Sequence, residues 1–208
     1  MLNSKVHIYG DGSCRTNPGG VGSWGVVLTT DAGTILHTMS GGEPDTTNTR
    51  MELMAIIRGL ELVHLYSLSK EVVVYSDSRY VIDNSAKLPS VNSFGSLWIT
   101  KTKESDLWER YHILDKSLNI EHIWVPGHTG HALQEIADTL ATNASGDLKS
   151  WLEKKKRNMK RKFNFSRGKP SSTRQGSTPK TLLEVYQEKE LNESFPAPSM
   201  TTDLPPSQ

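Results

Sequence analysis

The stretch Lys5-Val-His-Ile-Tyr-Gly-Asp-Gly-Ser-Cys14 decides the fold of this chain. Its apolar residues Val6 and Ile8 alternate with polar ones, which is the period-2 pattern of a β-strand. Glycines on both sides of Asp11 then allow the backbone to pass close to a bulky neighbour. We therefore expect a strand that breaks here and presents the Asp11 carboxylate at the edge of a sheet. Because Asp-Gly is also a common turn dipeptide, a simple turn is the alternative.

Three further acidic residues lie at comparable junctions, far from Asp11 in sequence. Glu52 falls in the first turns of a helical pattern, and Asp77 directly follows a run of β-preferring residues. Asp138 lies in a helical segment that follows the run Gly127–His131. These four carboxylates are the candidate functional residues.

The hydrophobic pattern predicts an α/β domain with a mixed five-stranded sheet flanked by helices. The first three strands form an antiparallel meander, and the last two each follow a helical segment, so they should pair in parallel through crossovers. The expected elements after the first strand are strands at Trp24–Thr30, Thr34–Ser40, Glu71–Ser76 and Ile120–Val125, a loop at 41–47, and helices at 49–65, 79–85, 106–117 (with Asp106 as N-cap) and 132–144. This order brings Asp11 and Asp77 to one sheet edge, where open α/β sheets usually bind ligands.

Charge divides the chain unevenly. Residues 1–148 contain 11 lysines and arginines against 17 acidic residues, a net charge of −6, whereas residues 149–208 contain 13 against 6, a net of +7. We predict a domain at 1–147, a basic arm at 148–180 and an acidic, proline-rich tail at 181–208. The arm is either a helical continuation or a disordered segment, and its charge predicts contact with nucleic acid. A merely solubilising tail is the alternative.

The cysteine content, the absence of targeting signals and one apolar segment indicate where the protein resides and what it binds. Cys14 is the single cysteine, which excludes an internal disulfide and fits a reducing compartment. Neither a signal peptide nor an apolar run long enough to span a membrane is found, so we expect a cytoplasmic monomer without membrane contact. The basic cluster leaves nuclear targeting open. Apolar residues within 181–195 predict a short helix that docks on a protein partner or on the domain.

Four carboxylates in one site require a counter-charge, because like charges a few ångströms apart raise one another's pKa. Oxygen-only ligands favour a hard cation, Mg²⁺ or alternatively Mn²⁺. Two such ions about 3.5–4 Å apart stabilise the attacking and leaving oxygens of an in-line phosphoryl displacement. Phosphodiester hydrolysis is therefore the expected reaction.

Five motifs in unbroken order resemble the type 1 ribonuclease H family, the bacterial and cellular form, over roughly residues 3–145. They are Asp11-Gly-Ser-Cys-x-x-Asn-Pro-Gly19, Thr46-Thr-Asn-x-Arg-Met-Glu-Leu53, Tyr75-Ser-Asp-Ser-x-Tyr-Val81, Asp106-Leu-Trp108 and Val125-x-Gly-His-x-Gly-His131. The resemblance implies the ribonuclease H-like fold and an endonuclease that cuts the RNA strand of an RNA–DNA hybrid, leaving 5′-phosphate and 3′-hydroxyl ends. The family's acidic quartet falls on Asp11, Glu52, Asp77 and Asp138, which would hold two Mg²⁺ ions, with Asp11 bridging both.

The resemblance also implies roles around this quartet. His128 matches the family's mobile histidine, which moves a proton or helps the product leave. The residues implied to lie near the RNA strand, apart from Glu52, are Gly12, Ser13, Cys14, Asn17, Asn48 and Ser78. Thr47 and Arg50 would grip a phosphate of the DNA strand, and Trp98 matches an aromatic residue of the basic handle. Since contacts to backbone and sugar carry no base information, cleavage should be largely independent of sequence.

Several positions depart from the family pattern. Thr49 and Arg79 stand where asparagine and glutamine commonly contact the hybrid, and Gln134 stands where asparagine is frequent. The handle segment Lys87–Lys103 contains only three lysines, so we expect weaker binding there and compensation by the basic arm. Two alternatives remain open: a hybrid-binding module without catalysis, and the ribonuclease H domain of a larger polymerase- or integrase-type polyprotein.

Overall fold

The structure is a computed structural model that describes residues 4–87, 102–127 and 129–167. His128, Trp98 and the segment 181–195 therefore lie outside the described residues. The chain divides into two compact units at Lys149/Ser150, within the last helix. Each unit is considered separately below.

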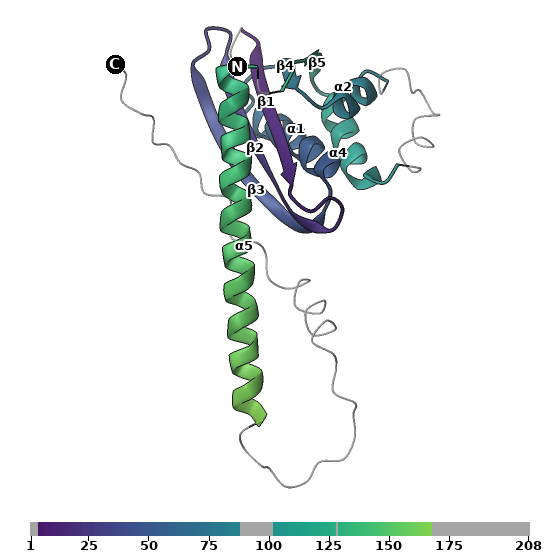
Figure 1. Ribbon diagram of the computed structural model, residues 1–208. Coiled ribbons are helices and arrows are strands. Elements are labelled where there is room, and N and C mark those ends of the chain that lie inside the picture. Colours follow the sequence, from purple (N-terminus) through teal and green to yellow (C-terminus); the bar gives the residue numbers. More distant parts are fainter. Residues whose placement is uncertain (1–3, 88–101, 128, 168–208) are drawn as a thin grey trace, which may run out of the picture. The chain divides into compact units, whose positions relative to one another are not determined.

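The predicted mixed five-stranded sheet is confirmed (Figure 1). Its strands are β1 (Val6–Cys14), β2 (Gly20–Thr30), β3 (Ile35–Thr46), β4 (Glu71–Ser76) and β5 (Asn119–Trp124). They lie in the order β3-β2-β1-β4-β5. The β1–β2 and β2–β3 pairs are antiparallel, and the β1–β4 and β4–β5 pairs are parallel. The central strand is therefore the one that carries Asp11.

Helices cover both faces of the sheet. The four described helices are α1 (Asn48–Leu65), α2 (Arg79–Ser85), α4 (Ser105–Asp115) and α5 (Ala132–Arg167). Successive β1 residues point to opposite faces, so Ile8 packs in the core beneath α1 and α4 while Tyr9 packs with Ala137 of α5. Trp108 of α4 is fully buried in the larger of these two cores. No described helix combines the length and apolar character that crossing a membrane requires.

The register of β1 and β4 determines where the site forms. The two strands pair in parallel from Val6 with Val72 up to Tyr9 with Tyr75. Asp11 and Asp77 each lie two residues beyond this last pair, at the carboxyl end of β4. The expectation that both carboxylates reach the same edge is thus supported by the backbone.

The glycines beside Asp11 do not break β1, contrary to the sequence-based expectation. The strand continues to Cys14 while pairing with β2. A Cβ atom at Gly12 would lie 2.1 Å from the backbone nitrogen of Glu52, and one at Gly10 would lie 2.5 Å from Cδ1 of Ile56. These glycines therefore serve the close approach of α1 to β1 instead of a turn.

Several element boundaries also differ from the prediction, among them the start of β2 at Gly20 instead of Trp24. β3 runs through most of the segment expected as a loop, because residues up to Thr46 stay paired with β2. Asp106 lies in the first turn of α4 and is not its N-cap, a position that Glu104 occupies without a side-chain cap bond. α5 extends past residue 144 to Arg167. Of the two alternatives for the basic arm, a helical continuation or a disordered segment, the described part is therefore helical.

Candidate active site

One small cleft collects three of the four predicted carboxylates. Asp11 comes from β1, Asp77 follows β4 directly, and Asp138 lies in the second turn of α5. The cleft is lined by Asp11, Asp77, Pro126, Gly127, Thr129, His131, Gln134, Glu135 and Asp138. Glu52 approaches from α1, since its charge acts on Asp11. The sheet edge and two helices thus bring together four residues that span most of the domain sequence.

Asp11 lies in an environment that opposes its ionisation. Burial, followed by the charge of Asp77 and then those of Asp138 and Glu52, raises the pKa of Asp11 to about 7. The N–H of Gly12 donates a hydrogen bond to Asp11 Oδ1 at 2.8 Å and acts in the opposite direction. The site therefore contains negative charge that the protein alone does not compensate.

Glu52 is oriented by two hydrogen bonds before any ligand arrives. Asn48 Nδ2 donates to its Oε1 at 2.6 Å, and the Ser78 hydroxyl donates to its Oε2. Burial and the charge of Asp77 raise the pKa of Glu52, while the bonds from Ser78 and Asn48 lower it. Two predicted substrate-binding residues thus act on a predicted metal ligand.

The residues of the cleft fit a hard divalent cation. All four acidic side chains offer oxygen, and the raised pKa of Asp11 reports charge that such a cation would neutralise. Across the described residues, no three acidic, histidine or cysteine side chains already form a metal-binding group.

Gln134 is a site residue whose role was missed from sequence. It is only 5% exposed, and its Nε2 donates to the carbonyl of Gly10, next to Asp11, at 3.1 Å. Its Oε1 is buried and has no hydrogen-bond partner among the described residues. A buried unpaired acceptor is costly, so this oxygen is a ready partner for a donor that enters the cleft. In the sequence, the only signal at Gln134 is that it stands at a position where asparagine is frequent in the family pattern.

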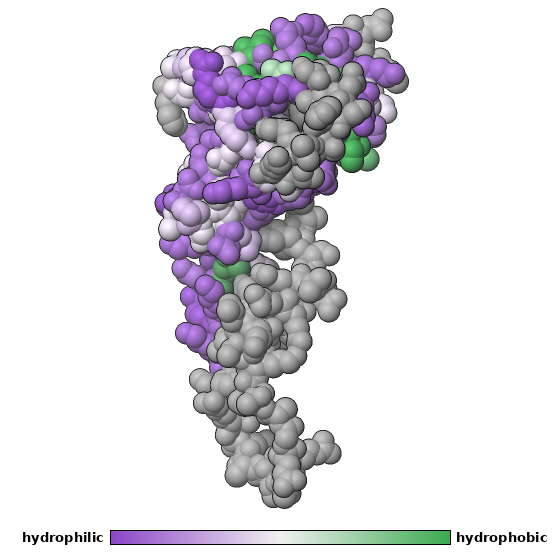
Figure 2. Space-filling model, turned by 90° about the vertical axis from the view of Figure 1, so that its right-hand side faces the viewer, coloured by the Kyte–Doolittle hydropathy of each residue, from purple (hydrophilic) through white to green (hydrophobic). Residues whose placement is uncertain are grey.

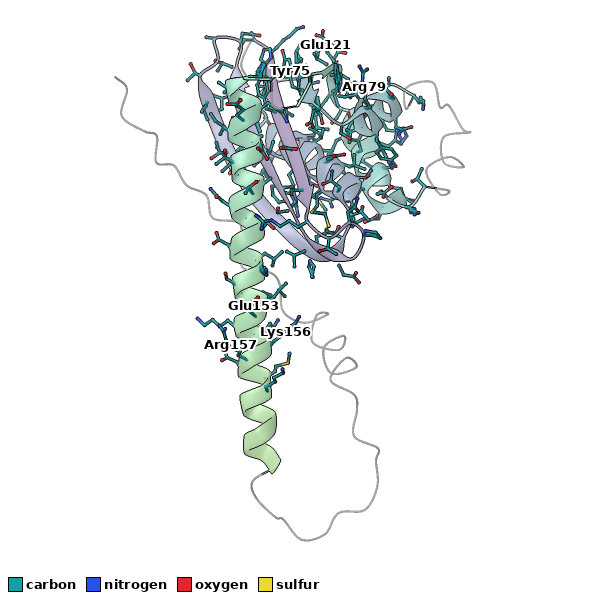
Figure 3. All side chains as sticks on the ribbon, in the orientation of Figure 1. Tyr75, Arg79, Glu121, Glu153, Lys156 and Arg157 are labelled. Atoms are coloured by element: carbon teal, nitrogen blue, oxygen red, sulfur yellow. The ribbon has the colours of Figure 1, made fainter. Side chains whose placement is uncertain are left out.

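Gly127 shapes the other wall of the cleft. A Cβ atom there would lie 2.5 Å from Oδ2 of Asp77, so a side chain at this position would displace the carboxylate. Trp124, which the sequence analysis did not single out, donates from Nε1 to the backbone carbonyl of Asp77 at 2.9 Å. Arg79 stacks over the Trp124 ring, 3.8 Å from its centroid, at the start of α2 (Figure 3). The Trp124 hydrogen bond thus holds the backbone carbonyl of Asp77 in place.

The predicted RNA-side residues form a connected polar group. Asn48 accepts from the backbone N–H of Cys14 at 3.0 Å, and its own N–H donates to Asn17 Oδ1 at 3.3 Å. Gly12 and Ser13 lie between Asp11 and Cys14 on the same strand. The structure thus brings the predicted residues of β1 and α1 together next to the carboxylates.

The two residues predicted to grip DNA have protein partners. The Thr47 hydroxyl caps α1 by accepting from the N–H of Arg50 at 3.2 Å. Arg50 donates from Nε to Glu43 at 2.9 Å and from both terminal nitrogens to the two oxygens of Asp106, at 2.8 and 2.7 Å. Asp106 and then Glu43 raise the pKa of Arg50. A phosphate would have to compete with these two carboxylates.

The comparisons with known proteins agree with this geometry. A family model described as RNase H matches residues 3–146. The ribonuclease H of Thiobacillus denitrificans is 42% identical over 146 residues, covering 68% of this chain and 93% of that protein. The ribonuclease H of Erythrobacter litoralis is 41% identical over 151 residues, covering 70% and 99%.

Solved structures show the same relationship. The N-terminal RNase H domain of a Mycobacterium tuberculosis protein, solved as a maltose-binding protein fusion, has a TM-score of 0.58 and 26% identity, covering 72% of this chain and 99% of that one. The compost-derived LC11-RNase H1, solved with an RNA/DNA hybrid, has a TM-score of 0.50 and 28% identity, covering 67% and 98%. The chain therefore belongs to the ribonuclease H family of enzymes.

Proposed function

We propose that this chain hydrolyses the RNA strand of RNA–DNA hybrids with two divalent ions, leaving 5′-phosphate and 3′-hydroxyl ends. The observation that carries the proposal is the cleft that Asp11, Asp77 and Asp138 line together, with Glu52 acting on Asp11. The similar LC11-RNase H1 was solved in complex with an RNA/DNA hybrid, which supports this choice of substrate.

In this proposal Asp11, Glu52, Asp77 and Asp138 would hold two Mg²⁺ ions, with Mn²⁺ as a substitute. The ions, when bound, supply charge stabilisation for an in-line phosphoryl displacement. Ser78 and Asn48 keep the Glu52 carboxylate in one orientation. His128, which follows Gly127 in the chain, would take up or deliver a proton, because an imidazole titrates near neutral pH.

Recognition of the hybrid depends on the 2′-hydroxyl of the RNA strand, which lies in the wide minor groove. Donors and acceptors on short side chains suit this task, and the polar group of Asn17, Asn48 and Cys14 lies beside the carboxylates. Arg50 would contact the DNA strand by exchanging one of its carboxylate partners for a phosphate. Trp98 would add a contact from the handle segment.

A cleavage assay tests the proposal. End-labelled RNA–DNA hybrid, double-stranded RNA and double-stranded DNA are incubated with the full chain in Mg²⁺ and, separately, in EDTA. We expect cleavage of the hybrid alone, only with Mg²⁺, at many positions along the RNA. Hybrid binding without cleavage in Mg²⁺ would instead identify a non-catalytic binding module.

A further inference from the structure

The second compact unit begins with a strongly cationic stretch of helix. Four side chains in residues 150–160 of α5 are both basic and exposed: Lys154, Lys156, Arg157 and Lys160. We call them the basic face. Lys156 and Arg157 extend outward from the helix in Figure 3, and the described part of this stretch is mostly hydrophilic in Figure 2. No ion pair joins these four side chains to a carboxylate anywhere in the described part of the chain.

The charge of this helix is not evenly distributed. Trp151, Leu152, Lys155 and Met159 are buried or half-buried and share one side of the helix, whereas Arg157 lies opposite them by helical periodicity. The Lys155 ammonium lies 4.6 Å from the Trp151 ring centroid, so this cation turns toward the apolar side. The four exposed cations therefore occupy the remaining helix surface, where one exposed carboxylate, Glu153, lies among them.

We propose that the basic face binds the phosphate backbone of a nucleic-acid duplex and holds the hybrid substrate against this enzyme. The inference rests on the proposed function for the identity of that substrate. Lys156 and Lys160 are like charges at i,i+4, which destabilises a helix until a polyanion compensates them. Residues 1–148 have a net charge of −6, so the cations of residues 149–208 favour long-range attraction of a polyanion to the chain.

A nucleic acid fits this surface better than an anionic membrane does. Helices that lie in a membrane interface insert large exposed apolar side chains beside their cations. Trp151 and Leu152 are not exposed, and within the described residues the exposed large apolar side chains are Leu65, Tyr66, Ile113 and Trp124, none of them in this helix. Phosphate contacts alone need only cations at helical spacing, which this face supplies.

Such binding has a recognisable signature. Contacts to phosphates carry no sequence or strand information, so the basic face should strengthen binding to hybrid and to double-stranded DNA alike. Cleavage chemistry should remain with the carboxylates. Double-stranded DNA should therefore compete with the hybrid for binding to the chain. This competition should be stronger when the basic face is intact.

The test compares two triple variants of the full chain. K154Q/K156Q/K160Q removes three charges from the basic face, and K5Q/K70Q/K116Q removes three exposed lysine charges from the first unit as a matched control. Glutamine is chosen because its helix propensity is close to that of lysine. Binding to labelled hybrid and to double-stranded DNA is measured by fluorescence anisotropy in EDTA from 50 to 300 mM salt, and cleavage is measured in Mg²⁺.

We expect the basic-face variant to bind both duplexes about 10-fold more weakly at 50 mM salt, with a log–log salt slope smaller by about two to three, while the control stays near wild type. KM for the hybrid should rise, with kcat unchanged. Equal salt slopes for the two variants, or a loss of binding confined to one of the two duplexes, would overturn the inference. A wild-type chain that binds but never cleaves would refute the proposed function and leave the binding comparison valid.

Discussion

Asp11 is the carboxylic acid whose ionisation the surrounding site opposes. Its pKa is about 7 because burial and three neighbouring carboxylates oppose its charge. Ionised Asp11 therefore destabilises the fold whenever no cation is present. A divalent ion that binds the ionised carboxylate relieves this unfavourable charge, and the relief strengthens metal binding.

The pH dependence of stability without metal follows from this shift. Because folding raises the Asp11 pKa from 3.8 to about 7, its contribution to stability is complete below pH 4 and is lost as the pH rises through 7. In EDTA at pH 8 we expect Asp11→Asn to melt about 5 °C above wild type. Mg²⁺ should raise the Tm of wild type more than that of the variant. Scanning calorimetry at pH 5 and pH 8 checks this, and a variant less stable than wild type at pH 8 in EDTA would contradict it.

Gln134 gives a second prediction about single residues. Gln134→Leu keeps similar volume and removes both the donor to the Gly10 carbonyl and the unpaired Oε1, so the net loss of stability should be only about 1 kcal/mol. Since Gly10 precedes Asp11, we also expect kcat for the hybrid to fall about 10-fold with little change in KM. The measurements are urea unfolding and steady-state kinetics. Reduced stability with wild-type kcat would limit Gln134 to a structural role.

At the scale of elements, the site depends on how closely β1, α1 and the loop after β5 approach one another. Gly12 and Gly127 both lie at such approaches, but their neighbours differ. The atom opposite Gly12 belongs to the α1 backbone, whereas the atom opposite Gly127 is the far end of the Asp77 side chain. One approach is therefore rigid and the other can adjust.

This difference predicts opposite outcomes for one kind of substitution. Gly12→Ala should destabilise the fold by about 3 kcal/mol, because strand and helix must separate. Gly127→Ala should leave the unfolding free energy within about 1 kcal/mol of wild type but lower kcat by about 100-fold, because Asp77 is turned away. Chemical denaturation and hybrid cleavage separate the two effects. Full activity in Gly127→Ala would show that Asp77 has no fixed position in the reaction.

The sequence predicts those elements whose own periodicity defines them. Buried strand β4 and amphipathic helix α1 are confirmed because their apolar residues repeat within the element. The continuation of β1 through Gly10 and Gly12 could not be predicted, since it depends on pairing with β2 and these glycines serve the close approach of α1. Asp106 resembles an N-cap locally, but Arg50, a long-range partner, takes its carboxylate.

In the candidate site, too, some features can be predicted from the sequence and others depend on contacts in the folded chain. Three of the four carboxylates lie in the quoted motifs, and the register of β1 and β4 supports the meeting of Asp11 and Asp77 at one edge. The roles of Gln134 and Trp124 depend on contacts with Gly10 and Asp77 that only the folded chain creates. Arg50 matches its motif, yet its two acidic partners are visible only in three dimensions.

At the scale of the whole molecule, the proposals place strand recognition and catalysis in the first unit and add salt-sensitive capture of the duplex by the second. The acidic first unit carries the four carboxylates, and residues 150–160 of the second unit carry exposed cations. Salt should therefore weaken substrate capture strongly while affecting the rate at saturating hybrid only slightly.

The central claim is that the four carboxylates act as one catalytic site, and non-additivity tests it most directly. Single-turnover cleavage of a labelled hybrid in Mg²⁺ is measured for wild type, Asp11→Asn, Asp77→Asn and the double variant. We predict that each single substitution lowers the rate at least about 1,000-fold and that the double variant is hardly slower, because groups that act as a unit lose their effect together. Near-wild-type cleavage by either single variant, or two small losses that simply multiply in the double variant, would contradict the account.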